Sequence, residues 1–256
     1  VSCGHDTSAA VAAVPAEGEG WAYLSCGTWS ILGTLLDRPV ATEHCLELGF
    51  TNEYTIGGWY LGRNISGLWL VQELRRKWDS SDDPWDYARM TEAAAAAGGG
   101  ALVNAADPSL LALADMEEAL LRLIREGGHE EPSGRGDLVR CVLESLALEY
   151  DYRLDAIGDL TGRRPEAVYM VGGGVRNRLL CQLTADACGV PVHAGADQCT
   201  ALGNALGQAL ALGILSDRQH IRQVMRDSFE MTTYRPSGQN WSPKRAEYRR
   251  RVRGER

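Results

Sequence analysis

Glycines, hydroxyls and one carboxylate stand at three places where this chain is expected to turn, and such groups can hold phosphate oxygens or accept a proton. The first place is Gly172-Gly173-Gly174, which follows the apolar residues 167–171 and precedes a helical pattern starting near Asn177. Glycine has no Cβ and tolerates φ > 0, so a ligand could lie against bare backbone at a helix N-terminus. Glycine turns also close ordinary strand–helix units, so this segment alone leaves both interpretations open.

The second place is the segment 26–30, which lies between the strand-like residues 21–24 and 31–36. This order predicts a hairpin whose tip carries Gly27, Thr28 and Ser30. Backbone N–H groups and hydroxyls at a tight turn can hold phosphate oxygens. A plain hairpin turn with solvated hydroxyls is the alternative.

The third place is Gly4-His5-Asp6-Thr7, just ahead of residues 9–14, which look like a strand. A carboxylate beside a glycine turn can act as a general base if it reaches the hydroxyl whose proton it takes. Asp residues also form turns and cap helices, so an ordinary structural role for Asp6 is the alternative.

With all three segments in view, the chain resembles the C-terminal half of a sugar kinase of the FGGY family, from residue 1 to about Pro236. Gly4-His5-Asp6-Thr7 is similar to the family's catalytic segment, and residues 25–30 are similar to its Ser-Gly-Thr-Trp-Ser phosphate turn. Further similarity lies in residues 51–53, 63–65, 67–72, 107–108, 139–147 and 172–189. The segments 64–65 and 69–72 resemble most closely the members that phosphorylate L-rhamnulose.

The resemblance implies a sugar site built around one carboxylate. Asp6 would be the general base that deprotonates the sugar hydroxyl, and His5 and Thr7 would contact the sugar beside it. Asn64 would also face the sugar. Phosphoryl transfer demands positioning and charge stabilisation more than covalent chemistry from the protein. Asp6 would therefore act mainly by accepting the proton as the new bond to phosphorus develops.

The resemblance also implies an ATP site. Thr28 would contact the terminal phosphates, and Gln72 would face the nucleotide. Adenosine would lie against the backbone of Gly172, Gly173 and Gly174, with Asn177 near the purine. Mg²⁺ would be the second cofactor, because it prefers phosphate oxygens with one or two carboxylates.

The activity that this resemblance implies is ATP-dependent phosphorylation of a ketose, L-rhamnulose to L-rhamnulose 1-phosphate first of all. The alternatives are a family member for fuculose or xylulose, and a non-catalytic nucleotide-binding domain of the same fold. The family's N-terminal lobe brings an Asp-Gly-Thr or Asp-Gly-Ser phosphate motif and much of the sugar site, and these 256 residues contain no such motif. We therefore expect residues 1–236 to be the nucleotide-binding C-terminal domain of such a kinase, with the sugar-binding lobe as its missing partner and little activity alone.

The composition restricts the class of protein. A chain of 256 residues with 45% hydrophobic residues can bury a sizeable core, and a net charge of −8 argues against nucleic acid and anionic membranes as partners. Seven cysteines without a C-x-x-C pair indicate free thiols and therefore the reducing cytoplasm. The sequence shows no secretory signal pattern, and its most apolar stretch, residues 205–215, is too short to cross a bilayer.

The order of apolar patterns predicts an α/β domain in which helices flank a mixed sheet. Strands are expected at residues 9–14, 21–25, 29–36, 167–171 and 190–192, and a turn-rich region at Gly49, Gly57, Gly58 and Gly62. Helices are expected from about Asn64, after a cap at Asp83-Pro84, and over residues 136–160, 177–188 and 198–212. The family resemblance specifies this arrangement further, as the actin-like ATPase, or ribonuclease H-like, fold.

Three smaller features complete the expectations. Gly203 and other small residues in helix 198–212 indicate either close helix packing or clearance for adenosine. Glu144 and Glu149 in helix 136–160 should pair with nearby arginines. Residues 237–256 are interpreted as a solvated basic tail, in preference to a binding patch, because they carry Lys244, Arg245, Arg249, Arg250, Arg251, Arg253 and Arg256.

Overall fold

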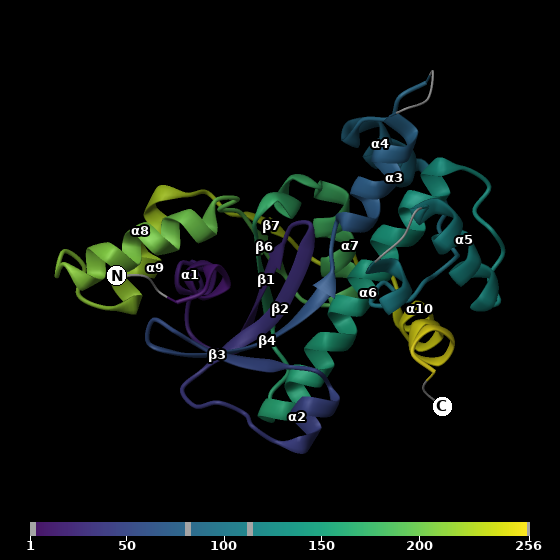
Figure 1. Ribbon diagram of the computed structural model, residues 1–256. Helices are drawn as coiled ribbons and strands as arrows, with labels where there is room; N and C mark the ends of the chain where they lie inside the picture. Colours follow the sequence, from purple (N-terminus) through teal and green to yellow (C-terminus); the bar gives the residue numbers. More distant parts are fainter. Residues whose placement is uncertain (1–3, 80–82, 112–114, 255–256) are drawn as a thin grey trace.

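A mixed β-sheet runs through the centre of the computed structural model, which describes residues 4–79, 83–111 and 115–254 (Figure 1). In these residues its seven strands lie in the order β3-β4-β2-β1-β5-β6-β7. The strands are β1 (Trp21–Cys26), β2 (Trp29–Leu36), β3 (Thr51–Thr55), β4 (Gly58–Ser66), β5 (Ala167–Val171), β6 (Val192–Ala194) and β7 (Thr232–Tyr234). The neighbours β1, β5 and β6 are parallel and the other pairs are antiparallel, which confirms the expected mixed sheet.

Helices cover both faces of this sheet. The helices are α1 (Asp6–Ala12), α2 (Glu43–Glu47), α3 (Trp69–Asp79), α4 (Tyr87–Ala96), α5 (Met116–Glu126), α6 (Arg135–Thr161), α7 (Arg178–Cys188), α8 (Cys199–Ala211), α9 (Arg218–Ser228) and α10 (Ser242–Glu247), with short helical turns η1 (Pro108–Leu111), η2 (Gly173–Arg176) and η3 (Tyr248–Val252). Helices α1, α8 and α9 gather on one side, and α6 and α7 pack on the other (Figure 1). Successive side chains of β1 point to opposite faces of the sheet. Tyr23 belongs to the core cluster that includes α1, and Leu24 belongs to the larger cluster that includes α6.

The long central helix confirms its sequence pattern. It was expected over residues 136–160 and is observed as α6, Arg135–Thr161. The carboxylates of Glu144 and Glu149 are buried, and each pairs with the arginine one turn away, Arg140 and Arg153 respectively, at 2.7 Å. The pairing predicted for both glutamates is therefore confirmed, and it leaves neither charge buried alone.

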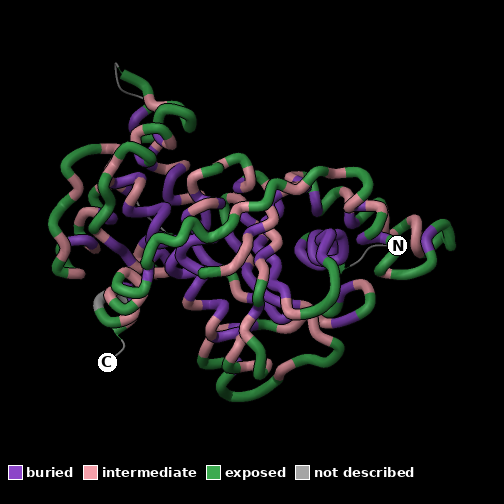
Figure 2. Tube along the Cα trace, turned by 180° about the vertical axis from the view of Figure 1, so that it is seen from behind, coloured by how far each residue is buried: buried purple, intermediate pink, exposed green. Residues whose placement is uncertain are grey.

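The strand expected at residues 9–14 is wrong, because this segment forms α1. His5 caps the helix by accepting a hydrogen bond from the backbone N–H of Thr7, and alanine, the best helix former, dominates the segment. Residues Thr7–Ala12 are buried, so the helix has no polar face and shows no 3.6-residue period (Figure 2). A buried alanine-rich helix and a buried strand look alike in a sequence.

The turn-rich region is confirmed at Gly49 and Gly57, which lie in turns, and is wrong at Gly58 and Gly62, which lie on β4. The helix start near Asn64 is also wrong. Residues 51–66 form the hairpin β3-β4, and Asn64 lies on β4, while the helix begins five residues later at Trp69. Gly62 and its partner Gly33 on β2 both lie against the Tyr23 hydroxyl, which an added Cβ would approach to 2.4 and 2.6 Å, respectively. These glycines are in the strands because they make room for a tyrosine, so they do not signal turns.

Two boundaries differ from the prediction, one because of a helix cap and one because of a proline. The N-cap of α4 is Asp86, whose side chain accepts from the N–H of Arg89, and not the expected Asp83. Strand β6 begins at Val192 and not at Val190, because Pro191 has no N–H to give to the ladder, although its carbonyl accepts from Val168 at 2.9 Å.

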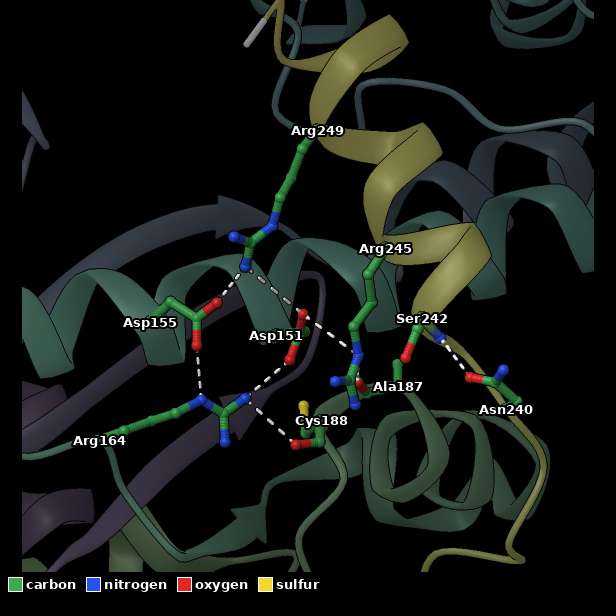
Figure 3. Close-up of polar contacts among 9 residues, drawn as sticks. All are labelled: Asp151, Asp155, Arg164, Ala187, Cys188, Asn240, Ser242, Arg245 and Arg249. Atoms are coloured by element: carbon green, nitrogen blue, oxygen red, sulfur yellow. Dashed lines mark hydrogen bonds and ion pairs between the residues drawn. The ribbon is translucent and has the colours of Figure 1, made fainter. Parts of the chain in front are cut away.

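The prediction of a solvated tail over residues 237–256 is wrong for the part that the structure describes. Trp241 and Tyr248 are buried in the larger core cluster. Arg245 and Arg249 lie next to Asp151 and Asp155 of α6, which Arg164 also contacts (Figure 3). The basic residues recur on one side of a short helix and meet acidic residues of α6, which a count of charges alone does not show. Arg256 lies outside the described residues.

Six of the seven cysteines lie in the described residues, and all six are buried free thiols, at positions 26, 45, 141, 181, 188 and 199. Cys3 lies outside them. Burial raises the pKa of the Cys141, Cys181 and Cys199 thiols to about 12, so none of these three is a thiolate at neutral pH. Among the described residues, no helix is long and apolar enough to cross a membrane.

Candidate active site

The hairpin between β1 and β2 is confirmed, and helix α3 fixes its tip. The N–H of Leu68 donates to the Gly27 carbonyl at 2.9 Å, and that of Trp69 to the Thr28 carbonyl at 3.0 Å. Gly67 lets the chain pass this closely, since an added Cβ would lie 2.7 Å from the Gly27 oxygen. The tip is thus held rigidly at the start of α3, with the Thr28 side chain exposed.

Ser30 does not have the role expected of a tip hydroxyl. It lies on β2, fully buried, with its hydroxyl 2.7 Å from that of Tyr150 on α6. A ligand cannot reach it there, so of the three residues predicted for the tip only Gly27 and Thr28 are accessible. Ser30 instead ties the hairpin to the long helix.

The glycine turn Gly172-Gly173-Gly174 follows β5 as predicted and leads through η2 into α7. Gly172 has φ = +85°, which only glycine adopts readily, and Gly174 lies so close to Cys26 that an added Cβ would come within 2.3 Å of its sulfur. An added Cβ at Gly173 would have no heavy atom within 4 Å. The outer two glycines are thus required by the fold, whereas the absence of a side chain at Gly173 keeps space open.

Asp6 begins α1, with most of its side chain exposed. Its Oδ1 accepts from the N–H of Thr7 at 2.7 Å and lies 2.9 Å from Nδ1 of His5. The His5 ring is also 3.8 Å from a carboxylate oxygen of Glu53 on β3. Among the described residues Oδ2 of Asp6 has no hydrogen-bond partner, so one oxygen is held in place and the other is free to accept a proton.

Asp6 lines a cavity of about 180 Å³ at the ends of β1 and β5. Thr7 lines it from α1, Gly27 from the hairpin tip, and Gly172 and Gly173 from the glycine turn. The three segments that the sequence analysis singled out therefore meet at one place, although 166 residues separate Asp6 from Gly172 in the chain. Thr200, at the start of α8, also lines this cavity; sequence analysis missed it because no spacing ties it to the other segments.

A larger cavity of about 620 Å³ lies beside the first one. Gln72 of α3 and Asn177 line it, together with Gly173 and Gly174. Its remaining surface is mainly apolar, from Leu68, Val71, Tyr87, Ala88 and Val139, with Thr91, Glu92, Arg176 and Arg178 as polar members. An apolar cavity of this size with a few polar groups suits a flat aromatic ring such as a purine.

Gly27 and Gly173 line both cavities, so the two spaces adjoin across bare backbone. A long ligand could therefore extend from the apolar cavity, past the hairpin tip, to the carboxylate of Asp6. The structure supplies no side chain at Gly173 to block this path. This continuity is the main geometric property of the candidate site.

Not all predicted site residues line these cavities. Asn64 pairs across the ladder with Ile31, which lines the smaller cavity, so its exposed side chain lies on the same sheet face beside that cavity. His5 and Thr28 border the site through their neighbours Asp6 and Gly27. Asn177 also has a structural role, because its side-chain oxygen caps α7 by accepting a hydrogen bond from the backbone N–H of Leu180 at 3.0 Å.

Residues 22–212 match the C-terminal domain of the FGGY family of carbohydrate kinases. The chain belongs to this family. It is 42% identical over 234 residues to the rhamnulokinase of Bacteroides thetaiotaomicron, a match that covers 91% of this chain and 48% of that protein. The rhamnulokinase of Halalkalibacterium halodurans is 35% identical over 231 residues, 90% of this chain and 49% of that protein. The chain thus spans about half the length of the curated relatives it matches.

Solved structures of other kinases share the fold. The xylulose kinase of Rhodospirillum rubrum matches with a TM-score of 0.69 at 18% identity, over 97% of this chain and 48% of that chain. The glycerol kinase of Plasmodium falciparum, solved with ADP, also gives a TM-score of 0.69 at 18% identity, over 96% of this chain and 49% of that chain. The expected actin-like ATPase fold is confirmed.

Proposed function

We propose that the protein containing this chain transfers the terminal phosphate of ATP to a ketose, L-rhamnulose above other sugars, and that Asp6 is the general base. The observation that carries the proposal is the continuity of the two cavities through Gly27 and Gly173, with Asp6 at one end. The kind of sugar follows from the rhamnulokinases among the relatives.

In this proposal the larger cavity takes adenosine. The purine packs on the apolar wall, and Gln72 and Asn177 offer it polar contacts. The phosphates pass over Gly172, Gly173 and Gly174, and the exposed Thr28 at the fixed hairpin tip donates to the terminal phosphates. The rigidity of the tip matters, because donors that are already in position need not reorganise during the transfer.

The sugar lies at the Asp6 end. Its reacting hydroxyl donates to Oδ2 of Asp6, while the backbone N–H of Thr7 holds Oδ1, and His5 and Thr7 lie beside the sugar. The oxygen of that hydroxyl attacks the terminal phosphorus, the bond from phosphorus to the bridging oxygen of ADP breaks, and the hydroxyl proton passes to Oδ2. Asn64 and Thr200 border this end and contribute further contacts to the sugar.

The cofactor Mg²⁺ fits this site as a partner of the nucleotide. Asp6 is the single carboxylate among the residues that line the smaller cavity, and the described residues contain no group of three metal-binding side chains. Mg²⁺ favours phosphate oxygens with one or two carboxylates, so it would bind chiefly to ATP and neutralise phosphate charge.

Two further parts of the proposal concern the whole protein. A sugar-binding lobe beyond this chain would complete the site from the side of the exposed Asp6 carboxylate, and closing of the two lobes would exclude water from the reaction. The buried free thiols support a place in the reducing cytoplasm.

The test is ADP release by the full-length protein with Mg-ATP and a panel of L-rhamnulose, L-fuculose, D-xylulose and glycerol. The proposal expects the highest kcat/KM with L-rhamnulose. A clear preference for another sugar would keep the kinase and replace its substrate. Absence of release with every sugar, while ADP still binds, would indicate a non-catalytic nucleotide-binding domain instead.

A further inference from the structure

A third cavity, of about 300 Å³, lies at the opposite end of β1 from the candidate active site. Trp21, the first residue of β1, lines it, whereas the last residue of that strand, Cys26, lines the Asp6 cavity. The two residues are five positions apart along the strand, which is roughly 17 Å at 3.3 Å per residue. Nothing in the proposed kinase chemistry uses this third cavity.

Arg222 of α9 lines this cavity. Among the charged side chains of the described residues, it has the most buried nitrogens without a hydrogen-bond partner. Its residue is 6% exposed, yet its Nε and one terminal nitrogen are buried without a hydrogen-bond partner. The guanidinium lies 4.9 Å from the centre of the Trp21 ring, and in the described residues no carboxylate forms an ion pair with it. Burial, with Arg218 and Arg226 nearby, lowers its pKa to about 10.

Two more arginines line the same cavity. Arg218, one turn before Arg222, donates to the Gly57 carbonyl at 2.5 Å, and Arg163 reaches across Gly20 from the loop after α6. Arg163 also pairs with Glu166 at 3.1 Å. Three guanidinium groups from two separate segments thus surround one space, and an unpaired buried cation among them calls for an anion.

The lining also offers groups for other parts of a ligand. Glu19 and Asp37 lie at the exposed rim of the cavity, where their oxygens can accept from hydroxyls. A carboxylate ligand offers two oxygens in one plane, whereas a phosphate offers three or more to guanidinium groups arriving from different directions. We propose that this cavity binds a phosphate group, either as inorganic phosphate or as part of a small hydroxylated phosphate ester.

The test is calorimetric titration of the full-length protein at constant ionic strength, with saturating Mg-ADP present so that the nucleotide site is filled. The probes are inorganic phosphate, D-fructose 1-phosphate and, as an uncharged control, D-fructose. We expect the phosphates to bind and D-fructose not to bind. Affinity at least tenfold higher for the ester would identify a phosphorylated metabolite, and equal affinities would identify the free ion.

Arg222→Met should reduce phosphate affinity at least tenfold. The matched control is Arg226→Met, one turn further along α9 and outside the cavity. Arg226 already pairs with Glu17 at 3.2 Å. The Arg226→Met variant should bind phosphate as the parent protein does. Phosphate should also raise the Tm of the parent protein and not that of Arg222→Met.

Unchanged binding by Arg222→Met, or no phosphate binding by the parent at millimolar concentration, would overturn the proposal. Removal of an unpaired buried charge should not unfold the protein. If Arg222→Met nevertheless fails to fold, Arg218→Gln provides the second variant, because that side chain is only half-buried. It should weaken phosphate binding several-fold, and unchanged binding there would equally refute the site.

Discussion

Substitution of Gly203 by alanine should impair catalysis from a position that touches no proposed ligand. Gly203 lies on α8 where it crosses α1, and an added Cβ would come within 1.9 Å of the Ala9 carbonyl oxygen. To reach 3.0 Å, below which real Cβ atoms essentially never approach, the two helices must separate by roughly 1.1 Å. Ala9 is three residues from Asp6 in the same short helix, so the general base moves with it.

The size of the effect follows from this displacement. A misplacement of about 1 Å can lower turnover by on the order of 10²-fold. Overpacking destabilises by about 1–3 kcal/mol, which opposes the gain of about 1 kcal/mol that Gly→Ala gives inside an ordinary helix. We therefore expect kcat to fall about 100-fold, with ADP affinity retained and no gain in stability.

The assay combines sugar-dependent ADP release, ADP titration and urea unfolding of the full-length protein. Ala205→Val is the control, because it adds bulk at an exposed position of the same helix. Turnover equal to the parent's, together with a gain of about 1 kcal/mol in stability, would show that α1 does not rest on Gly203 and would refute the reasoning.

Three other perturbations test the site and the core. Asp6→Asn should lower kcat by about 10²–10⁴-fold with ADP binding intact, and parent-like turnover would end the general-base assignment. Gly173→Glu should weaken ADP binding at least tenfold in calorimetry without lowering Tm, because the new side chain enters open space. Its control, Gly174→Ala, should lower Tm, because the added methyl group collides with Cys26. Equal ADP affinity in Gly173→Glu and the parent would remove Gly173 from the site. Tyr248→Phe should lower the free energy of unfolding in urea by about 1–3 kcal/mol, since its hydroxyl donates at 2.7 Å to the buried Glu149; an unchanged value would show that the contact does not stabilise the fold.

The parts of the fold that could be predicted are apolar segments whose length is clear and whose ends are marked by turn residues. Helix α6 and strands β1, β2 and β5 were found within one or two residues, because each has an apolar pattern bounded by clear turn residues. The misses share a different cause. Helix α1 is buried on all sides, and β4 contains glycines that accommodate Tyr23, so in both places tertiary packing replaced the local signal.

The C-terminal segment illustrates the same limit for charge. The run of arginines predicted a solvated tail, because the sequence alone does not show which acidic residues will lie next to them in the fold. In the fold, Asp151 and Asp155 of α6 lie on the surface where α10 packs, and three arginines gather around them (Figure 3). A basic run becomes part of the packed domain only when its partners are on the surface beside it.

The sequence by itself determined which groups are available for chemistry: an aspartate beside a glycine, a hydroxyl-bearing hairpin tip and a glycine turn between a strand and a helix. These are local properties of the chain, set by residue type and immediate neighbours. Only the tertiary structure decided that they meet, because the parallel pairing of β1 with β5 brings Gly27 and Gly173 to the same end of the sheet and α8 sets α1 beside them. It also decided that Arg222 is buried with no ion-pair partner among the described residues, since burial depends on how distant segments pack.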